Sequence, residues 1–212
     1  MKVLIACEES QRVCTAFRIR GHEAYSCDIV EPSGGHPEWH IHGDVLQIIG
    51  GGGTIETMDG VEHNVSKWDM MIAHPPCTKT SNAGANHLWR NKQLNVKRYY
   101  EGMCGKALFM ALLHADIQKI AIENPTPSAV FEFPKPTQII QPYMFGDPYT
   151  KRTLLWLKGL PKLQPTNVVE PRQTCHEAGT WFTKGGVERQ KNRSKTFYGI
   201  AEAMAEQWGG EV

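Results

Sequence analysis

The sequence lacks any long apolar run. None of its 212 residues belongs to a stretch near the roughly 20 apolar residues that span a membrane. The apolar segment at the N-terminus is too short for a signal peptide, because the chain turns acidic at Glu8. We therefore expect a cytoplasmic protein that does not bind membranes.

Surplus charge and paired cysteines are absent too. Lys and Arg number 23 against 22 Asp and Glu, a net charge of +1, so any surface that attracts nucleic acid must be local. The six cysteines show no CxxC spacing, which is typical of a reducing compartment. Neither the His36, His40 and His42 group nor Cys175-His176 has the four-ligand spacing of zinc sites, so we expect no metal. Nothing in the pattern indicates an oligomeric state.

The first 29 residues predict a βαβ unit. Lys2 to Ala6 is an apolar strand, Ser10 to Arg20 has helical apolar spacing and stops at Gly21, and His22 to Ile29 is strand-like. Such a unit implies a parallel sheet with a right-handed crossover.

Strands and helices continue to alternate, which predicts one doubly wound, mostly parallel α/β domain over residues 1–212. The later predicted elements are a third strand ending in Asp44-Val45-Leu46, a hairpin insertion near 50–65, a helix over Tyr99 to Leu113, and strands over Ile117 to Ile122, Gln138 to Gln141 and Arg152 to Leu157, with a closing helix over Thr196 to Trp208. The basic segment near 159–195 is irregular.

The apolar run from Trp68 to Ala73 ends in His74-Pro75-Pro76-Cys77. The prolines end the strand, because proline cannot donate a ladder hydrogen bond. This leaves a thiol at the carboxyl end of a strand, where open α/β sheets bind ligands. A lone cysteine there is more often a buried thiol, but a rigid backbone favours a nucleophile. His74, Lys79 and Arg90 are nearby groups able to hold a thiolate.

Carboxylates end other strands. Glu123, in Glu123-Asn124-Pro125, follows an apolar strand and needs a partner there, so it either caps a turn or takes part in catalysis. Asp28 and Asp44 are placed to bind ribose hydroxyls or an adenine amino group, or simply to form turns.

Taken in order, these motifs resemble the DNA cytosine carbon-5 methyltransferases, which use S-adenosylmethionine (SAM). The matching segments are Pro75-Pro76-Cys77, Glu123-Asn124, the stretch from Thr150 to Trp156 around Arg152, Gly43-Asp44-Val45 and the region from Lys195 to Ala205. The resemblance implies a Rossmann-like SAM-dependent methyltransferase domain with Cys77 as nucleophile. It also implies that Glu123 binds the ring nitrogen and amine of cytosine and that Arg152 orients the base.

The same resemblance implies a set of cofactor-binding residues: Ala6, Cys7, Glu8, Ser10, Asp28, Ile29, Asp44, Val45, Pro75, Phe197 and Tyr198. The sequence departs from the family in three places. The loop from Ala6 to Arg12 has no glycine, although the amides at the start of the next helix remain as donors. Thr78 and Pro125 replace the family's Gln and Val, and the 159–195 segment is too short for a full target-recognition domain.

DNA is the partner that the resemblance implies, and two basic stretches are placed to contact phosphates or are ordinary solvated faces. They are Lys79, Arg90, Lys92, Lys97 and Arg98, and Lys184, Arg189, Lys191, Arg193 and Lys195. Trp89 and Trp181 are candidates for base stacking. Without a full recognition domain we expect a sequence context of one or two bases. Compact relatives are typical of phages, where methylation shields DNA from restriction.

Three alternatives stay open. The enzyme could modify cytosine nucleotides or add a different one-carbon group. It could methylate exocyclic amines, although an aromatic residue after the prolines is missing. Finally, the glycine-free loop is compatible with a SAM- or DNA-binding module that has lost catalysis.

Overall fold

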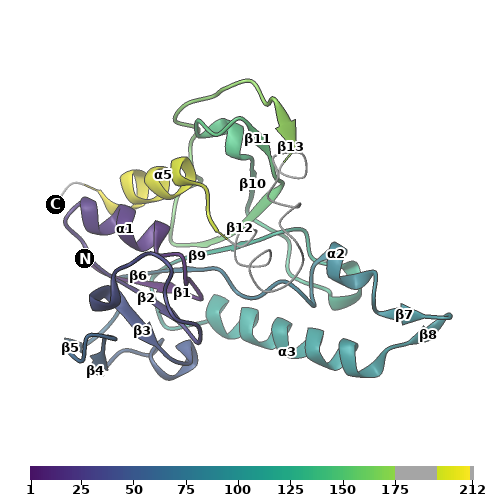
Figure 1. The fold of residues 1–212 in the computed structure, drawn as a ribbon, viewed down its shortest axis with the longest axis horizontal. Helices are drawn as coiled ribbons and strands as arrows, with labels where there is room; N and C mark the ends of the chain where they lie inside the picture. The colour runs from purple at the N-terminus through teal and green to yellow at the C-terminus, as the bar shows by residue number, and fades with distance from the viewer. Residues whose placement is uncertain (175–194, 211–212) are drawn as a thin grey trace.

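The computed structural model describes residues 1–174 and 195–210 and is built around a seven-stranded sheet of order β10-β12-β9-β6-β1-β2-β3 (Figure 1). Its strands are β1 (Lys2–Ala6), β2 (Glu23–Asp28), β3 (His40–His42), β6 (Met70–Ala73), β9 (Lys119–Asn124), β10 (Gln138–Ile140) and β12 (Thr153–Lys158). β12 pairs antiparallel with both β10 and β9, and all the other pairs in this sheet are parallel. The predicted mostly parallel, Rossmann-like α/β fold is confirmed.

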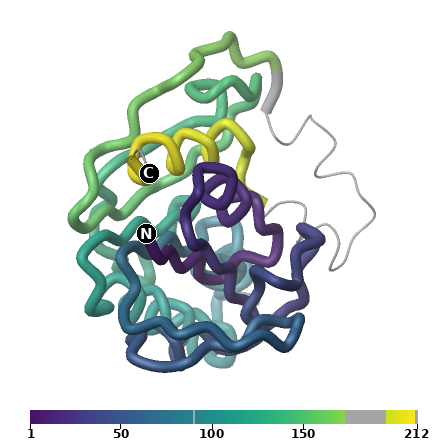
Figure 2. Tube along the Cα trace, turned by 90° about the vertical axis from the view of Figure 1, so that its left-hand side faces the viewer, coloured from purple at the N-terminus to yellow at the C-terminus, as the bar shows by residue number. Residues whose placement is uncertain are grey.

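Helices cover both faces of the sheet. One apolar cluster joins α1 (Arg12–Ile19) and α5 (Tyr198–Gly209) to alternate strand residues such as Val3 and Ile5. The other joins α3 (Val96–Leu113) to the intervening residues, such as Leu4. Successive side chains of a strand point to opposite faces, so continuous apolar strands are required here. Figure 2 shows α5 (yellow) beside α1 (purple), and the two helices pack together on one face of the sheet.

The predicted insertion hairpin is present as β4 (Gly53–Glu56) and β5 (Glu62–Val65). A second hairpin, β7 (Trp89–Arg90) with β8 (Gln93–Leu94), follows the short α2 (Asn82–Ala85) and projects from the body in Figure 1. The sequence pattern did not predict it, because neither strand has an alternating apolar face. Strand β11 (Tyr149–Thr150) pairs with β13 (Gln173–Thr174).

Short 3-10 turns fill the connections: η1 (Pro37–Trp39), η2 (Val45–Gln47), η3 (Ala129–Phe131) and η4 (Pro142–Met144). The prediction that the third strand ends in Asp44-Val45-Leu46 is wrong, because β3 stops at His42. The Asp44 carboxylate accepts a hydrogen bond from the Leu46 N–H at 3.0 Å, and this local bond favours a turn over a strand.

Strands β1, β2, β3, β6 and β9 all end at one border, which we call the carboxyl edge of the sheet. The chain runs outward from β1 in one direction and from β6 in the other, so the switch point lies between them. Ligands of open α/β sheets bind at such a point. Predicted residues Cys175, His176, Trp181, Lys184, Arg189, Lys191 and Arg193 lie outside the described residues. Within the described ranges, no helix has the length and apolar content needed to cross a membrane.

Candidate active site

The Pro-Pro-Cys turn leaves the carboxyl edge directly beside β1. The His74 N–H donates to the Ala6 carbonyl at 2.9 Å, which extends the β1–β6 ladder by one residue before the prolines end it. The Cys77 carbonyl then accepts from the N–H groups of Thr80 and Ser81 at 3.1 and 2.9 Å. Cys77 itself is half-buried. The backbone around the thiol is therefore fixed on both sides.

Arg98 of α3 holds the segment that follows the thiol. Its guanidinium donates to the Gly84 carbonyl at 3.1 and 2.9 Å and to the Thr78 carbonyl at 3.3 Å. Gly84 packs so closely that a Cβ there would lie 2.2 Å from the Thr78 oxygen. Of the predicted phosphate contacts, Arg98 is thus bound internally, and Lys79 pairs with Glu101 at 2.6 Å. Lys92 and Lys97 are exposed.

Glu123 lies in β9, next to β6, and is buried at 9% exposure. Its Oε2 is 3.2 Å from Nδ1 of His74. Burial tends to raise the pKa of this carboxyl, but the hydrogen bond from His74 and the positive charge of Lys151 outweigh burial, so the pKa is lowered. Glu123 is therefore held as a carboxylate despite its burial.

Arg152, the predicted base-orienting cation, is exposed and directly precedes β12. Because β12 is antiparallel to β9, with Leu155 opposite Glu123, its beginning lies at the carboxyl edge. The cation that acts on Glu123 is the adjacent Lys151, whose Nζ also lies 5.7 Å from the centre of the Phe197 ring. The sequence did not indicate Lys151. Lys151 and Arg152 are neighbours, and a shift of one residue in the strand register changes which of them lies nearer to Glu123.

The loop after β1 turns without glycine. Cys7 and Gln11 both adopt left-handed backbone angles, with φ of 58° and 57°. For residues with a side chain this conformation costs roughly 1–2 kcal/mol each. The chain thus makes the turns for which glycine is the default residue.

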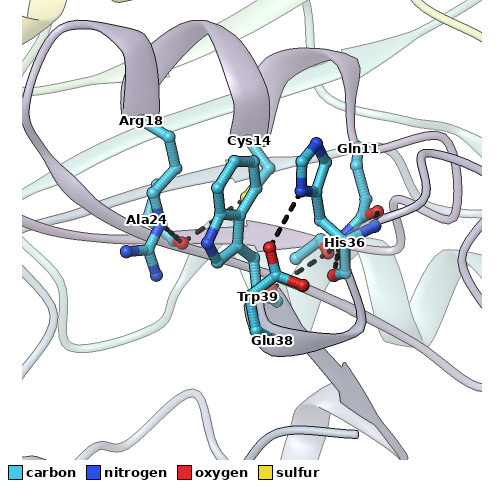
Figure 3. A network of polar contacts seen from close by, with 8 residues as sticks. Gln11, Cys14, Arg18, Ala24, His36, Glu38 and Trp39 are labelled. Carbon is cyan, nitrogen blue, oxygen red and sulfur yellow. Dashed lines mark hydrogen bonds and ion pairs between the residues drawn. The ribbon is translucent and has the colours of Figure 1, made fainter. Parts of the chain in front are cut away.

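Gln11 is held in that conformation by its side chain (Figure 3). Its amide donates to the His36 carbonyl at 2.7 Å and accepts from the His36 N–H at 3.1 Å. The His36 ring in turn contacts Glu38 at 2.9 Å and stacks on Trp39 with 3.7 Å between ring centres. These contacts attach the segment that follows β2 to the start of α1.

Glu8 caps α1 in place of a residue at the helix start. Its carboxylate accepts from the N–H groups of Val13 and Cys14 at 2.7 and 3.2 Å, whereas Gln11, at the N-cap position, makes no side-chain cap. Burial raises the pKa of Glu8, although the nearby His74 and these hydrogen bonds oppose the rise. The expectation that the helix amides remain as donors is therefore wrong for Val13 and Cys14.

Glu9 is the notable residue that the sequence did not single out, since a polar loop position gives no signal. It is buried at 8% exposure, and neither carboxylate oxygen has a hydrogen-bond partner among the described residues. Its negative charge acts on Asp28, the last residue of β2, and on His40, the first residue of β3. A buried carboxylate with no donor is costly, so this site suits a ligand that brings one.

Several predicted cofactor residues gather over the ends of β1, β2 and β3. Cys7 follows β1, Asp28 ends β2 and Asp44 follows β3; burial raises the pKa of the Cys7 thiol, and the charges of Asp28 and Asp44 add to the rise. The Asp28 carboxylate accepts from the Val30 N–H at 3.1 Å, and burial raises its pKa. Of the remaining predicted residues, Ala6, Val45 and Pro75 are buried, Ser10 is half-buried and Ile29 is exposed.

The predicted final motif returns to the start of α1. The Arg12 guanidinium lies 4.3 Å from the centre of the Tyr198 ring and donates to the Thr196 carbonyl at 2.8 Å. Phe197 lies 5.8 Å from Tyr149, ring centre to ring centre. Phe197 and Tyr198 thus reach the same side of the molecule as the glycine-free loop and Lys151.

Over residues 1–174 and 195–210, no group of three or more His, Cys, Asp or Glu side chains is arranged to hold a metal ion.

No protein-family model and no curated protein matches this sequence. Among solved structures, the chain is similar to a candidate DNA modification methyltransferase encoded within an E. coli prophage, with 11% identity, 80% coverage of this chain and a TM-score of 0.44. It is also similar to the methyltransferase EhMeth of Entamoeba histolytica, with 12% identity, 88% coverage of this chain and a TM-score of 0.43. The chain spans 52% and 61% of the lengths of these two structures.

Proposed function

We propose that this protein transfers a methyl group from SAM to carbon 5 of cytosine in DNA through a covalent adduct of Cys77. The observation that carries the proposal is the pairing of β6 with β9, in which Ala73 lies opposite Ile122. This register places His74 and Glu123 side by side, with the thiol three residues farther along. A nucleophile and an ionised carboxylate then share the carboxyl edge next to the switch point.

The residues of the glycine-free loop fit SAM. The molecule carries an α-ammonium group, ribose hydroxyls and an adenine amine, all of which donate hydrogen bonds to carboxylates. Glu9 is a buried carboxylate and Asp28 a half-buried one at this edge, and both oxygens of Glu9 lack a partner in the described part of the chain. We assign these two to the donor groups, with Cys7, Asp44, Phe197 and Tyr198 around them. When bound, SAM supplies an electrophilic methyl group.

The chemistry starts from the poor nucleophilicity of carbon 5. Addition of the Cys77 thiolate to carbon 6 forms a C–S bond and moves the ring's electron pair toward N3. Cys77 loses its thiol proton and N3 of the ring gains one. The net step therefore adds the sulfur to carbon 6 and a hydrogen to N3. Glu123, ionised at rest, accepts hydrogen bonds from N3–H and the exocyclic amine and thereby stabilises the enamine.

The last steps release the enzyme. Once carbon 5 carries the methyl group, its hydrogen leaves as a proton to a base, the double bond re-forms and the C–S bond breaks. Cys77 departs as a thiolate, and N3 returns its proton. Arg152 orients the base during these steps and offsets negative charge.

Contact with DNA is proposed for the exposed cations of the projecting β7–β8 hairpin and the start of α3. Lys92 and Lys97 are exposed, and Trp89, on the projecting hairpin, is 56% exposed. Cations that contact phosphates position a protein without reading sequence, while an aromatic ring can stack on a base. A cytosine in duplex DNA must leave the stack to reach Cys77, which costs a few kcal/mol.

The test incubates the purified protein with SAM and unmodified DNA, digests the DNA and measures methylated nucleosides by mass. We expect 5-methylcytosine. N4-methylcytosine or N6-methyladenine would instead establish methylation of exocyclic amines. A parallel reaction with free cytosine nucleotides separates a nucleotide enzyme from a DNA enzyme. Intact SAM binding with no methylated product in any arm would refute the proposal and leave a binding module.

A further inference from the structure

His74 occupies a position between two buried carboxylates. Its side chain is 8% exposed, and Nδ1 lies 3.2 Å from Oε2 of Glu123. The charge of His74 also acts on Glu8, the residue that caps α1. Its backbone N–H is bonded to Ala6, the last residue of β1. His74 therefore contacts the strand that leads into the glycine-free loop through its backbone, and the carboxylate of the proposed reaction through its imidazole.

The two ring nitrogens of His74 have different surroundings. A carboxylate accepts only, so Nδ1 must carry the hydrogen in the bond to Glu123. Nε2 is buried and has no hydrogen-bond partner among the described residues. The ring is thus held through one nitrogen, and that nitrogen is the one that determines how the Glu123 carboxylate is turned.

We infer that His74 is a positioning residue that fixes Oε2 of Glu123 and presents Oε1 to N3 and the exocyclic amine of the target cytosine. This inference rests on the proposed cytosine chemistry. A carboxylate accepts about four hydrogen bonds, so Oε2 remains able to take a second donor. Without Nδ1–H, the carboxylate is free to rotate away from the base, and a misplacement of about 1 Å costs on the order of 100-fold in rate.

The step that His74 supports can be measured without SAM. Addition of Cys77 to carbon 6 makes carbon 5 take a proton from solvent, and reversal of the addition then exchanges the hydrogen at carbon 5. The experiment incubates a cytosine-containing DNA duplex with each variant in D2O, without SAM, and follows deuterium at carbon 5 by mass.

Two substitutions at His74 separate the effect of the position of the hydrogen-bond donor from the effect of side-chain size. In H74N the amide nitrogen lies close to where Nδ1 was, whereas in H74Q it lies close to where Nε2 was. We expect H74Q to lower the exchange rate at saturating DNA by about 10- to 100-fold with the half-saturating DNA concentration unchanged. H74N should recover the rate to within about 3-fold of wild type, because it keeps a donor to Oε2. H114Q, at an exposed histidine after α3, is the matched control and should match wild type.

Exchange at the wild-type rate in H74Q, or equal losses in H74Q and H74N, would overturn the inference. If H74Q does not fold, H74N decides alone: recovery supports the inference, and loss as complete as in E123Q overturns it. Absence of exchange and of 5-methylcytosine in the wild-type protein is a separate result, which refutes the proposed function itself.

Discussion

Oε1 of Glu8 accepts a 2.7 Å hydrogen bond from the N–H of Val13, five residues later in the chain and inside α1. Val13 and Cys14 are the helix positions whose amides an N-cap side chain ordinarily satisfies. The loop therefore closes on its own helix, and the Glu8 carboxyl group fixes the backbone there.

Replacement of this cap should cost stability. E8A leaves two buried amides without an acceptor, each worth about 1–3 kcal/mol, so we expect a loss of about 2–6 kcal/mol in the free energy of unfolding. E8Q keeps one acceptor oxygen and should lose less. Urea denaturation followed by circular dichroism measures both. E31A, at an exposed loop position, is the control and should change stability by no more than about 0.5 kcal/mol. Equal free energies of unfolding for E8A and E31A would contradict the capping role of Glu8.

Glu9 should affect stability and ligand affinity in opposite directions. E9Q removes a buried charge that has no donor, so the protein without ligand should unfold at a higher temperature. A hydrogen bond to a charged group is worth about 1.5–3 kcal/mol, so SAM affinity should fall by about 10-fold or more. Thermal unfolding and titration calorimetry measure the two effects, with E31Q as the matched control. Unchanged SAM affinity in E9Q would remove Glu9 from the proposed site.

The strands of the sheet were predictable because each is encoded by a short stretch of consecutive residues. The central parallel strands β1, β6 and β9 are buried on both faces and read as short apolar runs, as in Val3, Leu4 and Ile5. Glycine or proline marks many of the ends. The predicted strand over Lys2 to Ala6 matches β1, and the predicted helix over Tyr99 to Leu113 begins three residues late relative to α3.

The side-chain contacts of the site depend on residues far apart in sequence, and these were not predictable. His74 meets Glu123 across 49 residues, and nothing in either segment indicates which nitrogen faces the carboxylate. Arg98 looks like a phosphate contact in the sequence, yet it bonds to the backbone of Gly84 and Thr78. Left-handed turns at Cys7 and Gln11 were unexpected because side chains ordinarily disfavour them, and here tertiary hydrogen bonds hold Gln11 in place.

Cys77 should be required for product and not for DNA binding. C77S replaces the thiol by a hydroxyl that is a far weaker nucleophile at neutral pH, so we expect methyl transfer to fall by about 1,000-fold or more. Mass spectrometry of digested DNA measures product, and fluorescence anisotropy measures DNA affinity, which should stay within a few-fold. C104S, at an exposed cysteine of α3, is the matched control and should retain activity. Retained activity in C77S would move the nucleophile elsewhere.

The lowered pKa of Glu123 predicts how stability depends on pH. Burial alone would raise this pKa, but the bond from His74 and the charge of Lys151 bring it below the ordinary value of 4.5. The folded state then binds the Glu123 proton more weakly than the unfolded state does. The contribution of the carboxylate to stability is therefore fully present above about pH 4.5 and is lost as pH falls through the lowered pKa.

E123Q tests this pH dependence, because its side chain cannot ionise and should lack it. We expect wild type to exceed E123Q in free energy of unfolding at pH 7, and the difference to shrink at pH 4 and below. Urea denaturation across this range checks it, with E31Q measured alongside. A constant difference between wild type and E123Q at all pH values would mean that Glu123 is not held as a carboxylate, and it would remove the acceptor that the proposed cytosine chemistry requires.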